Sequence, residues 1–393
     1  MKAQAGEPPS RGSLAVGPRI SERIAALQTR LDRTDISALL VTHLPNVFYL
    51  TGFIGSAGMV LVTRDAAMLI VDSRYVTAAT RLLATLARAV AIGLEPVQSS
   101  YEQTVVLLLD RLGPAMRSRV LGIESAHMTV AQHDWLVQAL AASGTTVQST
   151  TNLVEDGRAV KDAHELDTLR DAGLRLSSVM TQALRELRPG RSEREVAADI
   201  DLAMARAGFE RPAFETIVAA GGNTALPHAR SSARLLAVGD LVLLDFGGRL
   251  EGYCVDMTRV ASLGPPTVEF TAWHDAVREA HAAALSVVRD GVAAVEVDAA
   301  ARRALEHRGL GDAFTHGTGH GLGIEVHEAP RIGQRRTSME TEADVRLRVG
   351  MVCTIEPGVY VPPRGGIRLE DDLVVTKTGY ELLTNVSRDL HIV

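Results

Sequence analysis

Two aspartates lie in apolar segments that a short turn connects. Asp245 stands in residues 241–247 (LVLLDFG), and Asp256 stands in residues 253–258 (YCVDMT). Residues paired across an antiparallel hairpin have a constant sum of sequence numbers. The aspartate pair is centred at 250.5, and the turn of residues 248–252 is centred at 250. We therefore expect the two aspartates directly opposite one another, with Cβ atoms about 4.5–5.5 Å apart.

Two glutamates nearer the C-terminus repeat this arrangement. Glu356 ends a predicted strand of residues 351–356, and Glu370 lies in a second predicted strand that begins at residue 367. The Pro/Gly-rich segment 357–366 is predicted to be a loop whose bend is centred at 364, against 363 for the glutamate pair. Glu356 and Glu370 are thus also expected to be cross-strand partners, in a looser register than the aspartates.

Paired like charges on buried strands destabilise a fold unless a cation lies between them. Carboxylate oxygens prefer hard divalent cations, and four carboxylates suit two metal ions about 3.5–4 Å apart. A single acid at a strand end is more often a cap or a salt-bridge partner. Two matched pairs favour a dinuclear metal site over that interpretation.

Three of the twelve histidines, His316, His320 and His327, fall within one glycine-rich segment, residues 315–327 (THGTGHGLGIEVH). Histidine binds metals and carries protons near neutral pH, and glycine lets the backbone approach a bound group closely. The segment has neither the phosphate-loop pattern nor HExxH. Three clustered histidines therefore favour a functional site, whereas His228, in the turn-rich residues 221–228 (GGNTALPH), is a weak candidate by itself.

Two domains are predicted to position these residues. Residues 1–19 are expected to be a flexible tail, and residues 20–156 an α/β domain in which strands and helices alternate. The expected elements there are a helix at 21–31 and strands at 36–42, 48–53, 59–63 and 67–72. Residues 157–393 are predicted to be an α+β domain with helices at 161–187, 272–289 and 297–308. A further helix is expected between the capping box of Ser192 and Glu195 and the closing Gly208.

The composition excludes several other classes of protein. The chain has 46% hydrophobic and 22% charged residues and a net charge of −6, so a polycationic nucleic-acid surface is not expected. Its two cysteines, Cys254 and Cys353, are too few and too far apart for a disulfide framework or a thiolate zinc site. No apolar run approaches about 18 residues, and the first residues lack the apolar stretch of a secretory signal. We expect a cytoplasmic protein without membrane or nucleic-acid partners.

The motifs resemble those of the pita-bread metallopeptidases of the aminopeptidase P and prolidase type. The resemblance is carried by residues 223–228, 239–245, 252–259, 316–327, 355–358 and 368–371. The N-terminal half also resembles the smaller creatinase-like domain of these enzymes, which methionine aminopeptidases lack. The resemblance implies an α+β, pita-bread catalytic domain at residues 157–393, a creatinase-like α/β domain before it, and a homodimer.

By this resemblance the metal ligands would be Asp245, Asp256, His320, Glu356 and Glu370. Asp256 and Glu370 would bridge two divalent ions, with Asp245 on one ion and His320 and Glu356 on the other. Manganese suits this oxygen-rich set best, with cobalt, zinc and iron as alternatives. A hydroxide between the ions would attack the carbonyl group of an Xaa-Pro bond.

The resemblance also implies roles for residues around the metals. Glu356 would help to move the proton, His327 would stabilise the oxyanion, and His228 would bind near the proline nitrogen or its carbonyl. His316 matches a further active-site histidine, and Arg368 would support the ligands from the strand face of Glu370. The substrate would be a proline-containing peptide.

Several alternatives remain open at this point. The leading interpretation is an Xaa-Pro aminopeptidase, and the alternative is a prolidase that cleaves Xaa-Pro dipeptides. Arg335 and Arg336, in the charged segment 329–348, would hold a dipeptide carboxylate in a prolidase, or would belong to a solvated loop. A metal-free creatinase-like hydrolase and a non-catalytic binding protein of this fold are two further readings, and the complete ligand set speaks against both. Cys254 in place of serine, and residues 229–232 without the usual proline, are departures that touch no ligand.

Overall fold

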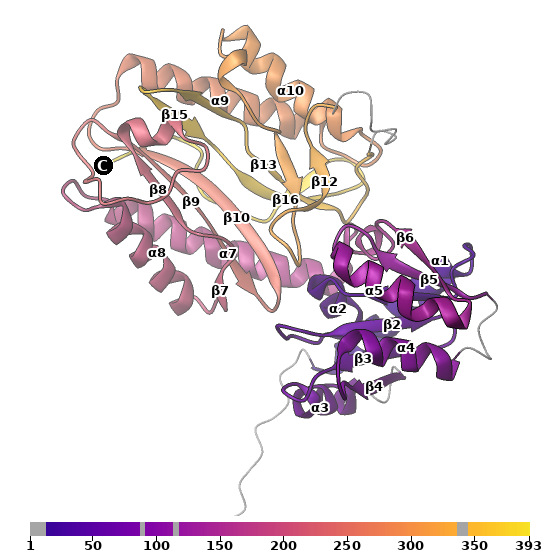
Figure 1. Ribbon diagram of the computed structural model, residues 1–393. Helices are drawn as coiled ribbons and strands as arrows, with labels where there is room; N and C mark the ends of the chain where they lie inside the picture. The colour runs from indigo at the N-terminus through magenta and orange to yellow at the C-terminus, as the bar shows by residue number, and fades with distance from the viewer. Residues whose placement is uncertain (1–12, 87–90, 113–117, 336–344) are drawn as a thin grey trace, which may run out of the picture. The chain divides into compact units, whose positions relative to one another are not determined.

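A computed structural model describes residues 13–86, 91–112, 118–335 and 345–393 of the chain (Figure 1). The chain divides into two compact units, Met1–Arg158 and Ala159–Val393. Each unit has a hydrophobic core of its own. Among the described helices, none combines the length and the apolar character that a membrane crossing requires.

The first unit is built on one mixed sheet of six strands in the order β4-β3-β2-β1-β5-β6. The central strands β1 and β2 pair antiparallel, whereas β1 and β5 pair parallel. Its elements are α1 (Ser13–Leu31), β1 (Ala38–Val41), α2 (Leu44–Thr51), β2 (Met59–Thr63), β3 (Ala67–Val71), α3 (Val76–Leu86), β4 (Ile92–Pro96), α4 (Tyr101–Leu112), β5 (Val120–Glu124), α5 (Val130–Leu140), β6 (Thr146–Thr150) and α6 (Glu155–Arg158).

Two expectations for this unit are corrected. Residues 48–53 were expected to be strand-like, but residues 48–51 belong to α2, Gly52 is its C-cap, and Phe53 lies in neither a helix nor a strand. Pro45 occupies the first turn of this helix, and Gly52 ends it with a φ of 72°, so the two residues supply the start and stop that the pattern hid. The predicted tail of residues 1–19 is also too long, because α1 begins at Ser13; residues 1–12 lie outside the described part of the chain.

The second unit combines two pairs of helices with two larger sheets and a separate hairpin. One sheet has the order β18-β10-β9-β7, with β8 also paired to β9, and the other has the order β12-β11-β13-β16-β17. The elements are α7 (Ala163–Glu186), α8 (Glu193–Arg206), β7 (Arg211–Pro212), β8 (Ile217–Ala220), β9 (Leu241–Leu250), β10 (Tyr253–Ser262), α9 (Val268–Val287), α10 (Ala294–His307), β11 (Gly319–Gly321), β12 (Glu328–Ile332), β13 (Val352–Ile355), β14 (Gly358–Val361), β15 (Gly365–Arg368), β16 (Asp371–Val375), β17 (Tyr380–Leu382) and β18 (His391–Ile392).

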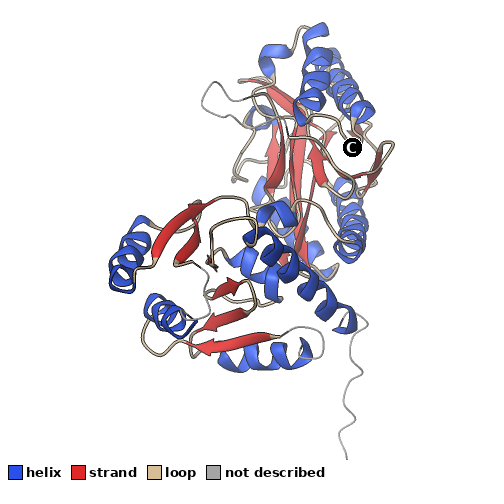
Figure 2. Ribbon diagram, turned by 90° about the vertical axis from the view of Figure 1, so that its right-hand side faces the viewer, coloured by secondary structure: helices blue, strands red, loops and turns tan. Residues whose placement is uncertain are grey.

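The helices cover the sheets from outside. Helices α7 and α8 pack on β8, β9 and β10, whereas α9 and α10 pack on β12 to β15; Figure 1 shows the first pair below the strands and the second pair above them, and Figure 2 shows the strands of this unit between its helices. Ala276, Ala280 and Ala284 recur every four residues along α9 and are fully buried, so a stripe of small side chains lets this helix approach the sheet closely. The inner faces of the strands are left for the site.

The hairpin of β9 and β10 differs in register from the prediction. Asp245 pairs with Thr258, and Asp256 pairs with Gly247, so the two aspartates are diagonal neighbours on one face instead of direct partners. The reason is the turn, which contains only Glu251 and Gly252, both with positive φ (48° and 85°). Two such residues form the tight turn that matches the twist of paired strands, so both strands run on through residues that were assigned to the turn.

The second predicted hairpin has the expected register but more strand. Gly358 pairs with Arg368 in the β14–β15 hairpin, and Ile355 pairs with Asp371 between β13 and β16. Both ladders share one register, and Glu356 and Glu370 face each other at the break between them. The predicted loop 357–366 is wrong in extent, because β14 occupies residues 358–361 within it. A Pro/Gly-rich composition had hidden this short strand.

Candidate metal centre

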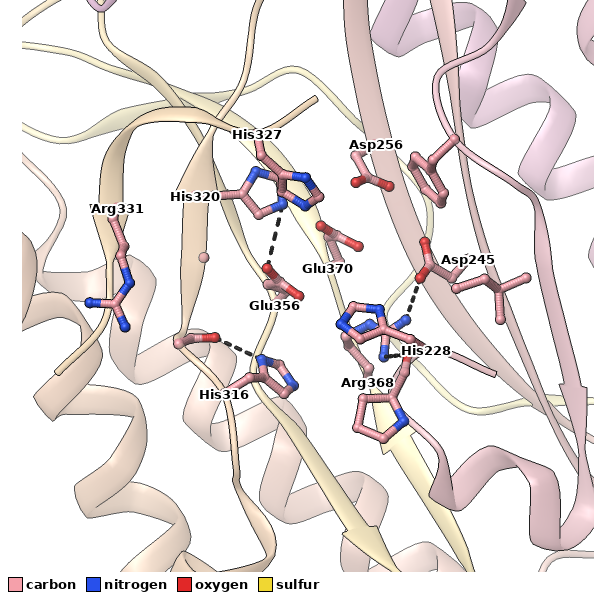
Figure 3. A pocket seen from close by; sticks show the side chains of 15 residues that line it. His228, Asp245, Asp256, His316, His320, His327, Arg331, Glu356, Arg368 and Glu370 are labelled. Atoms are coloured by element: carbon pink, nitrogen blue, oxygen red, sulfur yellow. Dashed lines mark hydrogen bonds and ion pairs between the residues drawn. The ribbon is translucent and has the colours of Figure 1, made fainter. Parts of the chain in front are cut away.

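One cavity of about 380 Å³ in the second unit is lined by all nine residues that were expected to be metal ligands or catalytic residues (Figure 3). They come from β9, β10 and β11, from the ends of β13 and β15, and from the connecting segments. The nine lining residues are His228, Asp245, Asp256, His316, His320, His327, Glu356, Arg368 and Glu370. Residues more than 140 positions apart in the sequence therefore meet at one place, where the two sheets of the unit join.

Three of these residues already form a group with metal-ligand spacing. Asp256, His320 and Glu370 each offer one donor atom, and these three atoms lie within 4.8 Å of one another. Glu356 lies beside them, with its Oε1 atom 3.5 Å from Nε2 of His320. In Figure 3 the side chains of Asp256, Glu370 and His320 point toward a common space.

Hydrogen bonds hold the backbone of Asp256 and the carboxylate of Glu370, and two aspartate oxygens remain without a partner. The backbone N–H of Asp256 donates to Asp372 at 2.8 Å, and the hydroxyl of Thr258 donates to Glu370 at 2.7 Å. Among the described residues, Oδ1 of Asp245 and Oδ1 of Asp256 are buried and have no hydrogen-bond partner. A buried acceptor without a partner is costly, so these two atoms fit the donor set of a bound cation.

Electrostatics lead to the same conclusion. Burial raises the pKa of Asp256 well above its ordinary value, and the charges of Glu370 and Asp245 raise it further. Burial and the charge of Glu356 likewise raise the pKa of Glu370. Burial also raises the pKa of Glu356 to about 7. Carboxyl groups that repel one another in a dry site gain strongly from divalent cations, which reverse the sign of the local field.

His320 presents a free lone pair to this group. Its Nδ1 atom lies 3.1 Å from the carbonyl oxygen of Gly321, and a carbonyl can only accept, so the proton must reside on Nδ1. Burial lowers the pKa of His320 to about 4, which keeps the ring neutral at neutral pH. Its Nε2 atom, on the side of Glu356, is then an unprotonated donor of the kind that metals bind.

His316 belongs to a different chain of hydrogen bonds. Arg368 donates from Nη1 to the Tyr360 hydroxyl at 2.8 Å, and that hydroxyl lies 2.9 Å from Nε2 of His316. Since the hydroxyl accepts from Arg368, its own proton points to Nε2, and Nδ1–H of His316 donates to the carbonyl of Gly317 at 2.8 Å. Burial and the nearby charge of Arg368 lower the pKa of His316 to about 4. His316 is therefore a neutral ring held in one orientation.

Arg368 connects this chain to the carboxylates. Its Nη2 atom forms an ion pair with Oδ2 of Asp245, and its Nε atom donates to the Thr258 hydroxyl at 3.1 Å. Arg368 is 4% exposed and sits in β15, two positions before Glu370. A planar guanidinium with several donors can orient several groups at once, and here it orients an aspartate, a threonine and a tyrosine.

The mouth of the cavity carries the remaining charges and rings. His228 and His327 are exposed members of the lining, and the ring of His327 packs edge-on against His320 at 4.3 Å between centroids. Arg331 also lines the cavity but was missed in the sequence. It pairs with His320 across β11 and β12, so a correct prediction of β12 would have placed it here.

The two arginines that were considered for binding a substrate carboxylate are not among the described residues that line the cavity. Arg335 is exposed and is not among the residues that line the cavity, and Arg336 lies outside the described residues. Arg331, from the same charged segment, lines the cavity instead. It donates to the backbone of Gln334 at 2.9 Å, and it forms no ion pair with any residue that the structure describes. Other lining residues without a sequence signal are Phe214, Ile217 and Pro227.

Comparisons with known proteins agree with this geometry. The model of metallopeptidase family M24 matches residues 167–377, and that of the creatinase/prolidase N-terminal domain matches residues 23–160. An Xaa-Pro dipeptidase of Pyrococcus horikoshii is 31% identical over 94% of this chain and 99% of its own.

Solved structures give the same relationship. The structure of an Xaa-Pro dipeptidase from Bacillus anthracis superposes with a TM-score of 0.86 and 32% identity, over 95% of this chain and 99% of its own. That of an X-Pro aminopeptidase from Thermotoga maritima does so with a TM-score of 0.81 and 30% identity, over 93% and 99%. The predicted family and two-domain fold are confirmed. The chain belongs to metallopeptidase family M24, with a creatinase/prolidase N-terminal domain in front of its peptidase domain.

Proposed function

We propose that this protein hydrolyses Xaa-Pro peptide bonds with the help of two divalent metal ions. The observation that carries the proposal is the convergence of Asp256, His320 and Glu370 within 4.8 Å in a cavity that Asp245 and Glu356 also line. The names of the relatives, which include both dipeptidases and an aminopeptidase for bonds to proline, support the choice of substrate.

The five residues Asp245, Asp256, His320, Glu356 and Glu370 would hold the metals. The unpartnered oxygens of the two aspartates and the unprotonated Nε2 atom of His320 fit this task. Manganese remains our proposed metal because four of the five ligands are carboxylates, with cobalt, zinc and iron as alternatives. When bound, such ions lower the pKa of water and polarise a carbonyl oxygen.

The other lining residues would act on the peptide. Glu356, whose carboxyl pKa lies at about 7 before metal binding, would accept and return the proton that moves during hydrolysis. His327 would donate a hydrogen bond to the developing negative charge on the carbonyl oxygen. His228, at the mouth of the same cavity, would bind at the proline nitrogen or its carbonyl. Arg368 would hold Asp245 in place through its ion pair.

Arg331 favours the dipeptidase alternative over the aminopeptidase. Arg331 lines the cavity, its guanidinium pairs with no carboxylate of the described residues, and a guanidinium matches a carboxylate in a bidentate manner. A dipeptide places its C-terminal carboxylate directly after the proline, within the cavity, whereas a longer peptide has no charge at that position. We therefore propose that Arg331 binds the carboxylate of an Xaa-Pro dipeptide.

The test compares an Xaa-Pro dipeptide with an Xaa-Pro-Yaa tripeptide in the presence of manganese, for the wild type and for Arg331→Ala. Loss of a charge-assisted contact should lower kcat/KM for the dipeptide about 10- to 100-fold and change the tripeptide much less. Arg303→Ala is the matched control, because Arg303 is exposed on α10 and does not line the cavity. Wild-type cleavage of the tripeptide, with no effect of Arg331→Ala on either substrate, would establish the aminopeptidase.

The assembly and location of the protein are proposals as well. We propose a homodimer, as the resemblance implies, and sedimentation of the full chain would test it. A proline-containing peptide is the proposed partner in the cytoplasm.

A further inference from the structure

A buried ion pair holds the end of the histidine segment. The Nζ atom of Lys161 is 2.7 Å from Oε1 of Glu328, and the two side chains are 1% and 8% exposed. Neither residue is among those that line the cavity. Glu328 is the first residue of β12 and directly follows His327. Since neighbouring side chains of an extended chain point to opposite sides, Glu328 points inward where His327 faces the cavity.

Backbone contacts of Lys161 and its neighbours fix the position of this lysine. Its N–H donates to the carbonyl of Gly350 at 2.9 Å, and Val160 forms an isolated β-bridge with Met351, next to β13. The following residue, Asp162, is the N-cap of α7, in a capping box with Glu165. The lysine is therefore anchored to the start of a 24-residue helix and to the strand that leads to Glu356. It is a fixed point relative to the carboxylates.

The segment that the pair holds is a tight turn between two histidines. The carbonyl of Gly323 accepts from the N–H of Cys254 at 2.6 Å, and the N–H of Gly323 donates to the carbonyl of Glu325 at 3.0 Å. The second carboxylate oxygen of Glu328 accepts from the N–H of Glu325 at 3.3 Å. One carboxylate thus joins the lysine to the turn that leads from His320 to His327.

Space in this turn is fully used. A Cβ atom on Gly323 would lie 2.5 Å from Oε1 of Glu328 and 2.9 Å from Cε of Lys161. The chain has only three lysines among its 41 basic residues, and one of them stands here. A slim ammonium stem fits beside Gly323, whereas a wider, planar guanidinium would not.

We propose that the Lys161–Glu328 pair is a positioning device, which sets His327 relative to His320 and the metal ligands. This inference rests on the proposed function, because it assigns His327 a task in the reaction. Lys161 lies beyond reach of a substrate in the cavity and acts only through the turn. Removal of Lys161 takes from the buried carboxylate of Glu328 its contact with the start of α7, and removal of Glu328 leaves the buried ammonium of Lys161 without that carboxylate. The turn then loses this anchor and moves.

Activity and backbone protection are the two readouts of the test. Lys161→Met should lower kcat about 10- to 100-fold, because a small displacement of a group that meets the transition state is costly. KM should change less than about threefold, because Lys161 does not reach the substrate and its loss leaves ground-state binding nearly unchanged. Hydrogen exchange of full-length, metal-loaded protein should become faster in residues 322–328, since the N–H groups of Gly323 and Glu325 lose their fixed acceptors. This second readout does not depend on which substrate the protein cleaves.

Three further variants separate positioning from stability. Leu169→Ala, in α7, removes a fully buried side chain that neither belongs to the ion pair nor lines the cavity, so it should lower Tm and leave both kcat and exchange in residues 322–328 unchanged. The double variant Lys161→Met/Glu328→Met removes both charges, so it should regain Tm relative to the single variant but keep the low kcat. Lys161→Arg should have a kcat as low as that of Lys161→Met, because the guanidinium does not fit beside Gly323.

A definite set of results would overturn the proposal. It fails if the double variant regains both Tm and kcat, or if exchange in residues 322–328 is the same in Lys161→Met and in the wild type. It also fails if Leu169→Ala lowers kcat as much as Lys161→Met does. A wild type that cleaves no Xaa-Pro peptide would count against the proposed function alone, because the exchange experiment would still read the state of the turn.

Discussion

The chemistry of this site depends on which atoms carry protons. Carbonyl partners place the proton of His320 and of His316 on Nδ1, and this leaves the Nε2 atom of each ring as an acceptor. The sequence alone predicts histidines that could bind metals or carry protons, but it cannot assign a tautomer. That assignment needs the neighbours of each ring nitrogen, which come from backbone geometry and, for His316, from Tyr360.

The carboxylates show the same limit at the level of single residues. Four acids on apolar strands predict a cation site, and the nine residues inferred from the sequence all line one cavity. Arg331 was missed because its position is defined by the pairing of β12 with β11, and Pro330 within that segment gave no indication of a strand. Tyr360 was missed because β14 lies in a stretch that was assigned to a loop.

Glu356 gives the first prediction at this scale. Burial raises the pKa of its carboxyl from an ordinary value of 4.5 to about 7 in the metal-free protein, with Arg368 acting in the opposite direction. A group whose pKa is raised by folding stabilises most below its unfolded pKa, and this contribution is lost as the pH rises through the folded pKa. The free energy of unfolding of the metal-free wild type should therefore fall, relative to Glu356→Gln, between pH 4.5 and about 7.

Urea unfolding of both metal-free proteins across this range measures that difference directly. The comparison with Glu356→Gln cancels the histidines, which titrate in both proteins and act in the other direction. A difference in unfolding free energy that stays constant with pH would mean that the carboxyl of Glu356 keeps an ordinary pKa.

At the scale of elements, tight turns and close contacts between strands determined which parts of the fold could be predicted from the sequence. The long helices were predictable because capping boxes and apolar periodicity agree, as at Ser192 and α8. The register of β9 and β10 was not, because Glu251 and Gly252 both adopt positive φ, and Glu-Gly is not one of the usual signals for such a turn. The predicted register was wrong by two residues. A shift of two leaves both aspartates on the same face of the hairpin, so the prediction that they lie together did not depend on the exact register.

Strand β11 gives a prediction about close packing. A Cβ atom on Gly319 would lie 2.0 Å from the carbonyl oxygen of Thr354 in β13, and the hydroxyl of Thr354 accepts from the N–H of His320 at 3.2 Å. Gly319→Ala should therefore push β11 away from β13, destabilise the protein by about 1–3 kcal/mol and weaken metal binding at His320. Denaturant unfolding and metal titration measure the two effects.

Gly379→Ala is the matched control for this substitution. A Cβ atom at Gly379 meets no atom within 4 Å and its φ is not positive, so the free energy of unfolding should change by no more than about 0.5 kcal/mol. Equal effects of the two substitutions on stability would show that the contact with Thr354 is not the cause.

At the scale of the whole molecule, every residue assigned to the reaction belongs to the second unit. The nine lie between His228 and Glu370, within Ala159–Val393 and all within the match to the peptidase family at 167–377. The two sheets of this unit supply different ligands, with the aspartates on β9 and β10 and His320 on β11. A metal bound between them would join two parts of the fold that are far apart in the sequence, and it should therefore also stabilise the unit.

The most direct measurement is the number of divalent ions bound per chain, with Tm and peptidase activity, in the wild type, Asp256→Asn and Glu370→Gln. We predict that the wild type binds two manganese ions and that its Tm rises on binding. Each variant should bind at least one ion fewer, should show no such rise in Tm, and should lose at least about 10³-fold of the activity on Xaa-Pro peptides. Because each variant removes one of several repelling carboxylates, it should be no less stable than the metal-free wild type. If both variants kept two ions and full activity, Asp256 and Glu370 would not be metal ligands, and the proposed mechanism would be wrong.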